Sequence, residues 1–205
     1  MTQEPQAQEP QAPALQYAGT LSVLIAEPID VGPTPEGHRR IIPITGGTVS
    51  GPRLKGRVLP GGADFQILHT PELSQLDARY ALELEDGAIV SVDNAAIRAG
   101  SADALGRIAR GEPVDPEEIY FRCAPRLRTS APEWDWVNRT LFVGTGERYP
   151  DRVVVHVFAV GDPACAQGPS ADRRATAVDQ PPVPHRVEPW RMQRGSCASW
   201  PDGTR

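Results

Sequence analysis

The carboxylate of Asp64 follows a glycine-rich stretch and opens an alternating strand pattern. Residues 46–64 hold six glycines and two prolines, and glycine in strands marks bulges and tight corners. We therefore expect sharply bent strands that place Asp64 at the rim of a curved sheet. There it can act as a general base if burial or a neighbour tunes its pKa. Alternatively, it accepts backbone N–H bonds that fix the glycine turn.

Tyr120 and Arg122 are the candidate partners of this base. They lie two residues apart in a strand pattern and so share one face, whereas Phe121 and Cys123 take the other face and resemble core residues. Inside an apolar barrel, the pair would offer a hydrogen-bonding hydroxyl and a cation to a phenol, enolate or carboxylate. The alternative is an ion pair at the rim. We assign candidate catalytic roles to Asp64, Tyr120 and Arg122.

Candidate ligand-binding residues lie in two further segments. Arg79 shares a strand face with Asp77 and would hold an anion by a bidentate contact if it points inward; otherwise the two occupy a solvated outer face. Trp136 is either a stacking wall for an aromatic ligand or a plug in the barrel floor. Asn138 binds ligand or simply completes a turn, and Arg139 is an alternative to Arg122 for stabilising an oxyanion.

These polar candidates are expected to converge on one cavity, because an unpaired buried polar group costs roughly 1–3 kcal/mol. They come from four separate segments: Asp64, Arg79, Tyr120, Arg122, Trp136, Asn138 and Arg139.

Metal and nucleotide sites are not expected. The histidines are far apart and lack metal-binding spacing: His38, His69, His156 and His185. The cysteines lack C-x-x-C spacing, and we expect a buried free thiol at Cys123 and exposed thiols at Cys165 and Cys197. Residues 46–62 lack the G-K-[S/T] ending of a phosphate loop, and there is no G-x-S-x-G motif. We predict no metal and no cofactor.

The charge balance and the chain's start bear on partners and location. With 21 Lys and Arg against 26 Asp and Glu, the formal charge is −5, so no general attraction to nucleic acid is expected. No apolar run approaches the roughly 20 residues that span a bilayer, and no signal peptide is visible. We expect a cytoplasmic protein without nucleic-acid or membrane partners, a small-molecule ligand, and outer apolar strand faces that would suit a homodimer.

The clearest strand runs from Leu76 to Glu85, where apolar and polar residues alternate. Asp86-Gly87 follows and predicts a type I′ hairpin turn. One helix is expected from Ser101 to Arg110, capped by Ser101 and ended by Gly111. It should cover a barrel mouth or a sheet edge.

Other strands are expected at 17–27, 38–50 with a bulge at Gly46-Gly47, 53–59, 63–69, 88–94, 120–128, 139–145 and 152–160, the last buried on both faces. Residues 29–37 read as a loop. Many closely spaced strands with almost no helix predict an all-β fold, a single closed or nearly closed antiparallel β-barrel of about 8–9 strands. The barrel domain would span 17–160, between a disordered tail at 1–16 with a repeated Gln-Glu-Pro-Gln-Ala and a Pro-rich, mostly disordered tail at 161–205.

Several motifs together resemble the bacterial and fungal family called domain of unknown function 3237. The resemblance runs from about 17 to 160 and rests on Gly46-Gly47, Gly51-Pro52, Gly56, Pro60-Gly61-Gly62-Ala63-Asp64, Asp77-Ala78-Arg79-Tyr80, Asp86-Gly87, Tyr120-Phe121-Arg122, Pro125, Trp136 with Asn138-Arg139, and Phe142-Val143-Gly144. Phe65 stands where such proteins often carry Trp. The resemblance implies a small lipocalin-like β-barrel and no settled activity.

Two functional hypotheses follow. The first is a cofactor-free lyase, dehydratase, isomerase or cyclase that moves a proton on an aromatic or polyketide-like compound, with Asp64 as the base. The second is a carrier that binds such a ligand without turnover. The surroundings of Asp64 distinguish them, since an enzyme needs this carboxylate to be partly desolvated and to face a pocket.

Overall fold

The structure, a computed structural model, describes residues 12–161. The predicted tail residues 1–11 and 162–205, with Cys165 and Cys197, lie outside this range. The strands are β1 (Ala14–Ile25), β2 (Ile29–Thr34), β3 (Gly37–Ser50), β4 (Gly56–Val58), β5 (Gly62–Thr70), β6 (Leu73–Leu84), β7 (Ile89–Gly100), β8 (Ile119–Arg128), β9 (Leu141–Arg148) and β10 (Arg152–Gly161). The helices are α1 (Ala102–Ala109) and the 3₁₀ segments η1 (Pro116–Glu118) and η2 (Pro132–Arg139).

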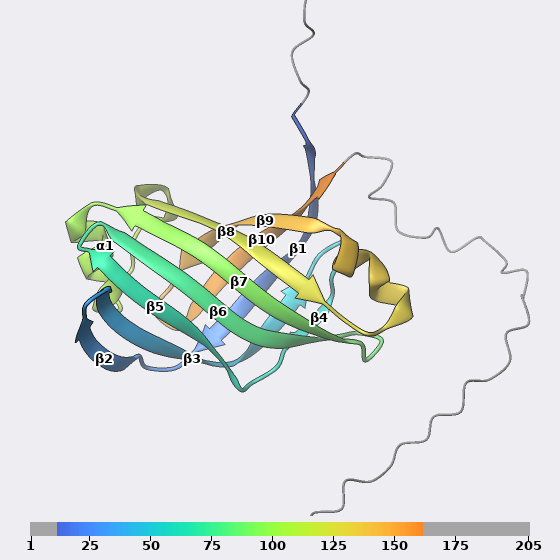
Figure 1. Cartoon of the computed structure of the whole chain (residues 1–205), viewed down its shortest axis with the longest axis horizontal. Helices are drawn as coiled ribbons and strands as arrows, with labels where there is room; N and C mark the ends of the chain where they lie inside the picture. Colours follow the sequence, from blue (N-terminus) through green and yellow to red (C-terminus); the bar gives the residue numbers. More distant parts are fainter. Residues whose placement is uncertain (1–11, 162–205) are drawn as a thin grey trace, which may run out of the picture. The chain divides into compact units, whose positions relative to one another are not determined.

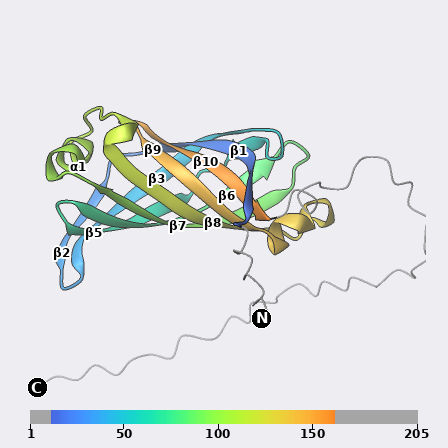
Figure 2. The same ribbon diagram turned by 90° about the horizontal axis from the view of Figure 1, so that it is seen from above.

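Eight of the strands that the structure describes close into an antiparallel ring. The order is β1-β10-β9-β8-β7-β6-β5-β3, and β3 returns to pair with β1 (Figures 1 and 2). The short β4 bridges β3 and β6 beyond β5, while β2 forms a hairpin with the start of β3. The predicted closed all-β barrel is confirmed.

Alternation along the strands separates a packed interior from an outer wall. On β6, Leu76, Tyr80 and Leu82 are buried, and the intervening Asp77 and Arg79 face outward. The main core cluster combines inward residues of all the ring strands except β5 with residues of β4 and η2. A closed barrel of this size is filled by its own side chains unless a cavity is left on purpose.

The two ends of the barrel differ. At one end, α1 connects β7 to β8 and packs its apolar stripe in a separate small cluster with Val114 and Ile119. Ser101 caps this helix by accepting a hydrogen bond from the backbone N–H of Ala104 at 3.1 Å, as predicted. At the other end lies η2, whose Val137 is 1% exposed and belongs to the main core. The barrel is therefore packed at the η2 end.

Several sequence-based boundaries need correction. The strand predicted at 88–94 continues to Gly100, and the one predicted at 139–145 spans Leu141–Arg148. β1 begins at Ala14 rather than residue 17, because residues 14–16 pair with the end of β10. The expected loop at 29–37 contains β2, whose Pro33 is tolerated since β2 is an edge strand. The expected strand at 53–59 shrinks to the three residues of β4. β10 is buried on one face, not two, because Val153, Val155, Val157 and Ala159 face the interior, whereas the residues between them are only partly buried.

The hairpin between β6 and β7 exists but is not a type I′ turn. Such a turn needs positive φ at both central residues, and Asp86 does not have it, whereas Gly87 has φ 85°. The Gly87 N–H donates to the Leu84 carbonyl at 2.9 Å, and the Leu84 N–H donates to the Ala88 carbonyl at 2.9 Å. Three residues therefore form the loop, with the glycine taking the left-handed position.

Two glycines allow the tight curvature that closure requires. The register of β1 against β3 shifts beside Gly46, which confirms the predicted bulge, and a Cβ on Gly47 would lie 2.0 Å from the Ser22 carbonyl oxygen. A Cβ on Gly62 would lie 2.4 Å from the Arg79 carbonyl oxygen and 2.5 Å from the Tyr80 Cβ. Gly62 thus lets β5 and β6 approach closely just before Asp64.

Three valine substitutions separate this steric requirement from backbone strain. Gly62→Val should lower the free energy of unfolding by on the order of 1–3 kcal/mol or more, because backbone atoms block the side chain. Gly61→Val, with φ 108° and open space, should cost about 1–2 kcal/mol through φ alone. Gly161→Val, which has neither problem, should stay within about 0.5 kcal/mol. Denaturant unfolding measures all three, and a Gly62 variant as stable as the Gly161 control would contradict the packing described.

Candidate functional site

The pairing of neighbouring strands places a group of polar side chains on the inner face of the barrel. Asp64, Ala78 and Asn94 are paired neighbours across β5, β6 and β7. Gln66 lies two residues beyond Asp64 and pairs with Arg40 of β3. These positions alternate with outward ones, so their side chains share the interior with the apolar core.

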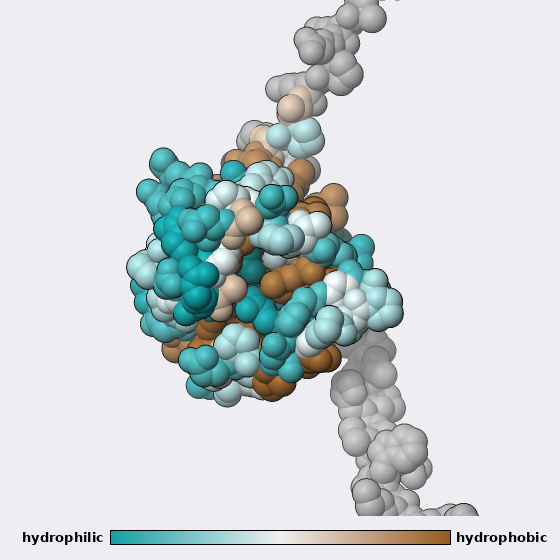
Figure 3. Space-filling model, turned by 90° about the vertical axis from the view of Figure 1, so that its left-hand side faces the viewer, coloured by the Kyte–Doolittle hydropathy of each residue, from teal (hydrophilic) through white to brown (hydrophobic). Residues whose placement is uncertain are grey.

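The polar group lines a cavity that opens at the α1 end. Its outer chamber has a volume of about 620 Å³, within the usual range for small-molecule sites. The chamber is bounded by the end of β1 with residues 26–28, by residues 108–111 at the end of α1, and by the β9–β10 turn. Seen from this end, hydrophilic surface surrounds a central hollow (Figure 3).

A narrower inner chamber continues from the outer one into the barrel. The two share Ile25, Ile42, Gln66, Arg98 and Arg148, and the inner part has a volume of only about 40 Å³. Apart from its polar groups, its lining is aliphatic or aromatic, including Ile44, Leu76, Phe121, Val153 and Val155. The cavity therefore combines a roomy polar mouth with a tight apolar interior.

Asp64 is the acidic residue of the inner chamber. Its Oδ2 accepts a hydrogen bond from Gln66 Nε2 at 2.6 Å, and its Oδ1 is inaccessible to solvent. Burial raises the pKa of Asp64 above its ordinary 3.8, while the Gln66 hydrogen bond and the nearby Arg98 partly offset that rise. A carboxylate with a raised pKa is a better proton acceptor near neutral pH than an exposed one.

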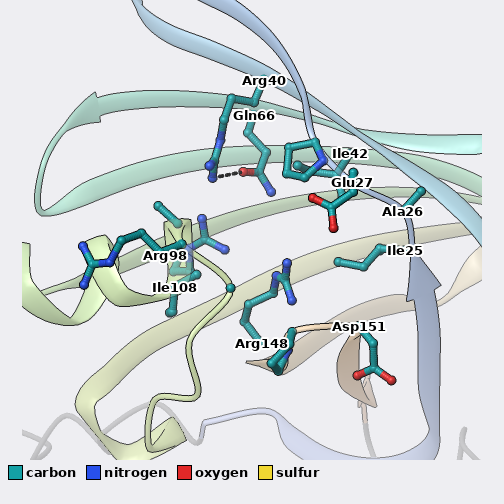
Figure 4. Close-up of a pocket in the computed structure, with 15 residues that line it drawn as sticks. Ile25, Ala26, Glu27, Arg40, Ile42, Gln66, Arg98, Ile108, Arg148 and Asp151 are labelled. Carbon is teal, nitrogen blue, oxygen red and sulfur yellow. Dashed lines mark hydrogen bonds between the residues drawn. The ribbon is translucent and has the colours of Figure 1, made fainter.

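Four arginines line the outer chamber. Arg110 is ion-paired with Glu112, and the three considered below are Arg40, Arg98 and Arg148 (Figure 4). Arg98 is 3% exposed, and burial lowers its pKa to about 10. Burial also lowers the pKa of Arg40 and Arg148. Arg40 donates to Gln66 Oε1 at 3.2 Å, so an Arg40–Gln66–Asp64 chain crosses the cavity. Within residues 12–161, none of the three arginines forms an ion pair with a carboxylate.

The arrangement favours a small organic anion. The outer lining carries four arginines against the carboxylates of Glu27 and Asp151, so its net positive charge favours an entering carboxylate or enolate. Asp64 lies deeper and carries the one acidic side chain of the inner lining. The site can therefore hold negative charge at its mouth while a base faces the interior.

Asp64 alone among the predicted site residues lines this cavity, so the expected convergence is wrong. Arg79 lies on the outer face of β6 and pairs with Asp77 at 2.9 Å. Tyr120 is 55% exposed, and the Arg122 guanidinium lies 5.0 Å from its ring on the outer face of β8. The physical reason is strand parity, since the buried Leu76 and Phe121 fix the inward positions of β6 and β8.

The remaining candidates lie at the η2 end. Trp136 packs against Phe142 with ring centroids 5.8 Å apart and under the Arg53 guanidinium at 3.9 Å, as the plug alternative required. Asn138 completes a turn, because its Oδ1 accepts from the Thr129 N–H and its Nδ2 donates to the Thr129 carbonyl, both at 3.0 Å. Arg139 pairs with Asp135 at the surface.

Sequence reasoning missed the other polar residues of the cavity, among them Arg40, Gln66, Asn94, Arg98 and Arg148. The sequence does contain a signal for them, because every second residue of a strand points to the same face as its buried apolar residues. Asn94 and Arg98 stand in phase with the buried Val90 and Val92 of β7. Polar residues in phase with an apolar face indicate an interior site.

In residues 12–161, no group of three or more His, Cys, Asp or Glu side chains is arranged to hold a metal ion. Among the helices of the same residues, none is long and apolar enough to cross a membrane. Cys123 is a buried free thiol, as predicted.

Comparison with known proteins agrees with the fold. The profile of the family described as "Protein of unknown function (DUF3237)" matches residues 13–160. A UPF0311 protein of Rhodopseudomonas palustris is 48% identical over 144 residues, covering 70% of this chain and 94% of the relative. A crystal structure of a conserved protein of unknown function from that species aligns with a TM-score of 0.69 and 46% identity, covering 74% of this chain and 99% of that one.

Two fungal proteins are more distant. The PR-toxin biosynthesis cluster protein 7 of Penicillium roqueforti is 27% identical over 163 residues, covering 69% of this chain and 87% of the relative. The crystal structure of an enzyme from Penicillium herquei has a TM-score of 0.56 at 17% identity, covering 75% of this chain and 98% of that one. The latter likeness concerns the fold alone.

The burial of Asp64 predicts a pH-dependent effect on stability. Because its folded-state pKa is raised, the folded chain binds this proton more tightly than the unfolded chain, and stability is lost as the pH rises from 3.8 through the folded pKa. Asp64→Asn should therefore unfold at higher denaturant concentration than the wild type at neutral pH, and the gain should fade as the pH falls towards 3.8.

Asp77→Asn is the matched control, because Asp77 makes an exposed ion pair on the outer wall. Its effect should stay between about 0 and 1 kcal/mol of destabilisation. A wild type as stable as the Asp64 variant at every pH would show that the Asp64 carboxylate is not desolvated.

Proposed function

Because this chain belongs to the DUF3237 family, whose function is unknown, we propose its activity from the site itself: cofactor-free proton transfer on a small organic anion. Asp64 is the base, and Arg40, Arg98 and Arg148 hold the negative charge. The observation that carries the proposal is a desolvated carboxylate facing the interior of a cavity whose mouth holds three arginines without carboxylate partners in the described chain.

The chemistry follows from where charge must develop. An ionised Asp64 removes a proton from a carbon next to a carbonyl group, and the electron pair of the broken C–H bond moves onto the carbonyl oxygen as an enolate. Returning the proton to another carbon completes an isomerisation, and loss of a leaving group from the enolate completes an elimination. The guanidinium groups stabilise the oxyanion more than the neutral carbonyl, which lowers the barrier.

The hydrogen-bond chain supports the same assignment. Gln66 is 5% exposed and is fixed between Arg40 and Asp64, so its amide holds the carboxylate in one orientation. A positioned base gains rate because the reacting atoms need not be reoriented. Burial of Arg40, Arg98 and Arg148 reduces the solvent screening of their charges, which strengthens their attraction for a developing oxyanion.

The relative named for a PR-toxin biosynthesis cluster supports a small-molecule substrate. Its name places that protein in a cluster for the biosynthesis of PR-toxin. An aromatic or polyketide-like substrate that carries a carboxylate or an enolisable carbonyl would suit the apolar walls and the positive mouth.

The alternative is a carrier that binds the same anion without turnover. The arginine cluster alone favours it, since holding an anion needs no base. The desolvated Asp64 favours the enzyme, because a carboxylate inside an anion-binding cavity weakens binding and is retained at a cost in stability.

Phenylpyruvate serves as a probe, since it joins a carboxylate, a ketone and acidic C–H bonds to an aromatic ring. The protein should bind it and accelerate exchange of its C3 hydrogens with D₂O above the buffer background, followed by proton NMR. Asp64→Asn should lower the exchange rate by about 10²–10⁴-fold and retain binding. Equal exchange in both proteins would leave the carrier as the function, and failure of phenylpyruvate to bind would contradict the anion site.

Arg148→Gln tests the anion-binding half of the proposal. Loss of a charged hydrogen-bond donor worth about 1.5–3 kcal/mol should raise the Kd for phenylpyruvate by roughly 10–100-fold, measured by titration calorimetry. Arg79→Gln is the matched control, because Arg79 lies outside the barrel with Asp77. Equal affinities in the two variants would place the ligand elsewhere.

A further inference from the structure

Three polar atoms near the inner chamber lack hydrogen-bond partners within the described chain. They are Asp64 Oδ1, Asn94 Oδ1 and Arg98 Nε, and each is shielded from bulk solvent. Asn94 and Arg98 are 5% and 3% exposed. Buried polar atoms in folded proteins nearly always have a partner in the protein or in an ordered water molecule.

All three residues line the same inner chamber. Asp64 and Asn94 flank Ala78 in one row across β5, β6 and β7, and the small side chain of Ala78 leaves the space between them. The Asn94 amide interacts with the Cys123 thiol and lowers its pKa against the larger effect of burial. The Asn94 Oδ1 is shielded from solvent and has no partner among the described residues.

The numbers of donors and acceptors match a single water molecule. Asp64 Oδ1 and Asn94 Oδ1 are acceptors and need two O–H groups, whereas Arg98 Nε–H is a donor and needs one lone pair. Buried waters typically make about three hydrogen bonds and need roughly 10–15 Å³ of such space. The inner chamber, at about 40 Å³, has room for this water but not for the body of an organic ligand.

We propose that Asp64, Asn94 and Arg98 form a binding site for one buried water molecule through which Asp64 exchanges protons with the ligand. This step rests on the proposed function. The chamber is too small for the body of an organic anion, which occupies the outer chamber instead. A water molecule beside Asp64 spans the remaining gap between the carboxylate and the ligand.

The relay balances in protons and electrons. The water oxygen takes the proton from the ligand carbon while one water O–H bond breaks and its proton bonds to Asp64 Oδ1. The electron pair of the C–H bond stays on the ligand as an enolate beside the arginines. The reverse transfer returns a proton to the ligand and restores both the carboxylate and the water.

A high-resolution crystal structure of the full chain tests the water site directly. We expect an ordered oxygen within hydrogen-bond distance of Asp64 Oδ1 and Asn94 Oδ1. Direct contact between these two side chains, or a chamber filled by a protein side chain, would overturn the proposal.

Ala78→Val tests the relay without altering a polar group. Valine fills the space between Asp64 and Asn94, so the ordered oxygen should be absent from the variant. The rate of hydrogen exchange in phenylpyruvate should fall at least 10-fold, whereas the Kd for phenylpyruvate should change less than 3-fold. Ala159→Val is the control, because Ala159 is a buried alanine of β10 that does not line the chamber. It should keep both the oxygen and the exchange rate.

The outcomes separate this inference from the function on which it rests. Wild-type exchange in a folded Ala78→Val variant overturns the relay while leaving Asp64 as a direct base. Exchange that is equal in wild type and Asp64→Asn overturns the proposed function, and the crystallographic oxygen then decides the water site alone. If Ala78→Val does not fold, the wild-type structure still decides.

Discussion

Closure of the sheet by the pairing of β3 with β1 is the constraint on which the site depends. It converts one face of the sheet into an interior in which polar groups are poorly solvated. A charge placed there must be balanced by other charges, by hydrogen bonds or by a ligand. Asp64, Gln66 and three arginines meet this requirement only in part, and the part left unmet is what a ligand would supply.

The same closure explains the glycines that precede Asp64. At Gly62, β5 comes so close to β6 that no side chain fits, and the next inward position on β5 is Asp64. The close approach of β5 to β6 at Gly62 and the burial of the Asp64 carboxylate therefore both follow from the same bend of β5. The Tyr80 side chain begins beside Gly62 and lines the inner chamber beyond it, and burial raises its pKa, which keeps that hydroxyl neutral.

Sequence patterns predicted the barrel well because alternation is a local property. The strand at 76–85, the cap at Ser101 and the glycine corners each depend on residues close in the chain. The site was predicted less well because inward direction depends on parity relative to the core. Tyr120 and Arg122 have suitable side chains but stand at outward positions of β8. Asn94 and Arg98 stand at inward positions of β7, in phase with the buried Val90 and Val92. Arg40 and Arg148 come together with them only through ring closure, which no local pattern encodes.

The packing of η2 against the core has a kinetic consequence. With Val137 and Trp136 packed at that end, the cavity has its mouth at the α1 end. Under the proposed function, a product would therefore leave by the path through which its substrate entered. Complete release would have to precede the next capture, and tight binding by the arginines would slow the exit of an anionic product. A ligand longer than the chamber would extend between α1 and the β9–β10 turn, where its length would decide whether it fits.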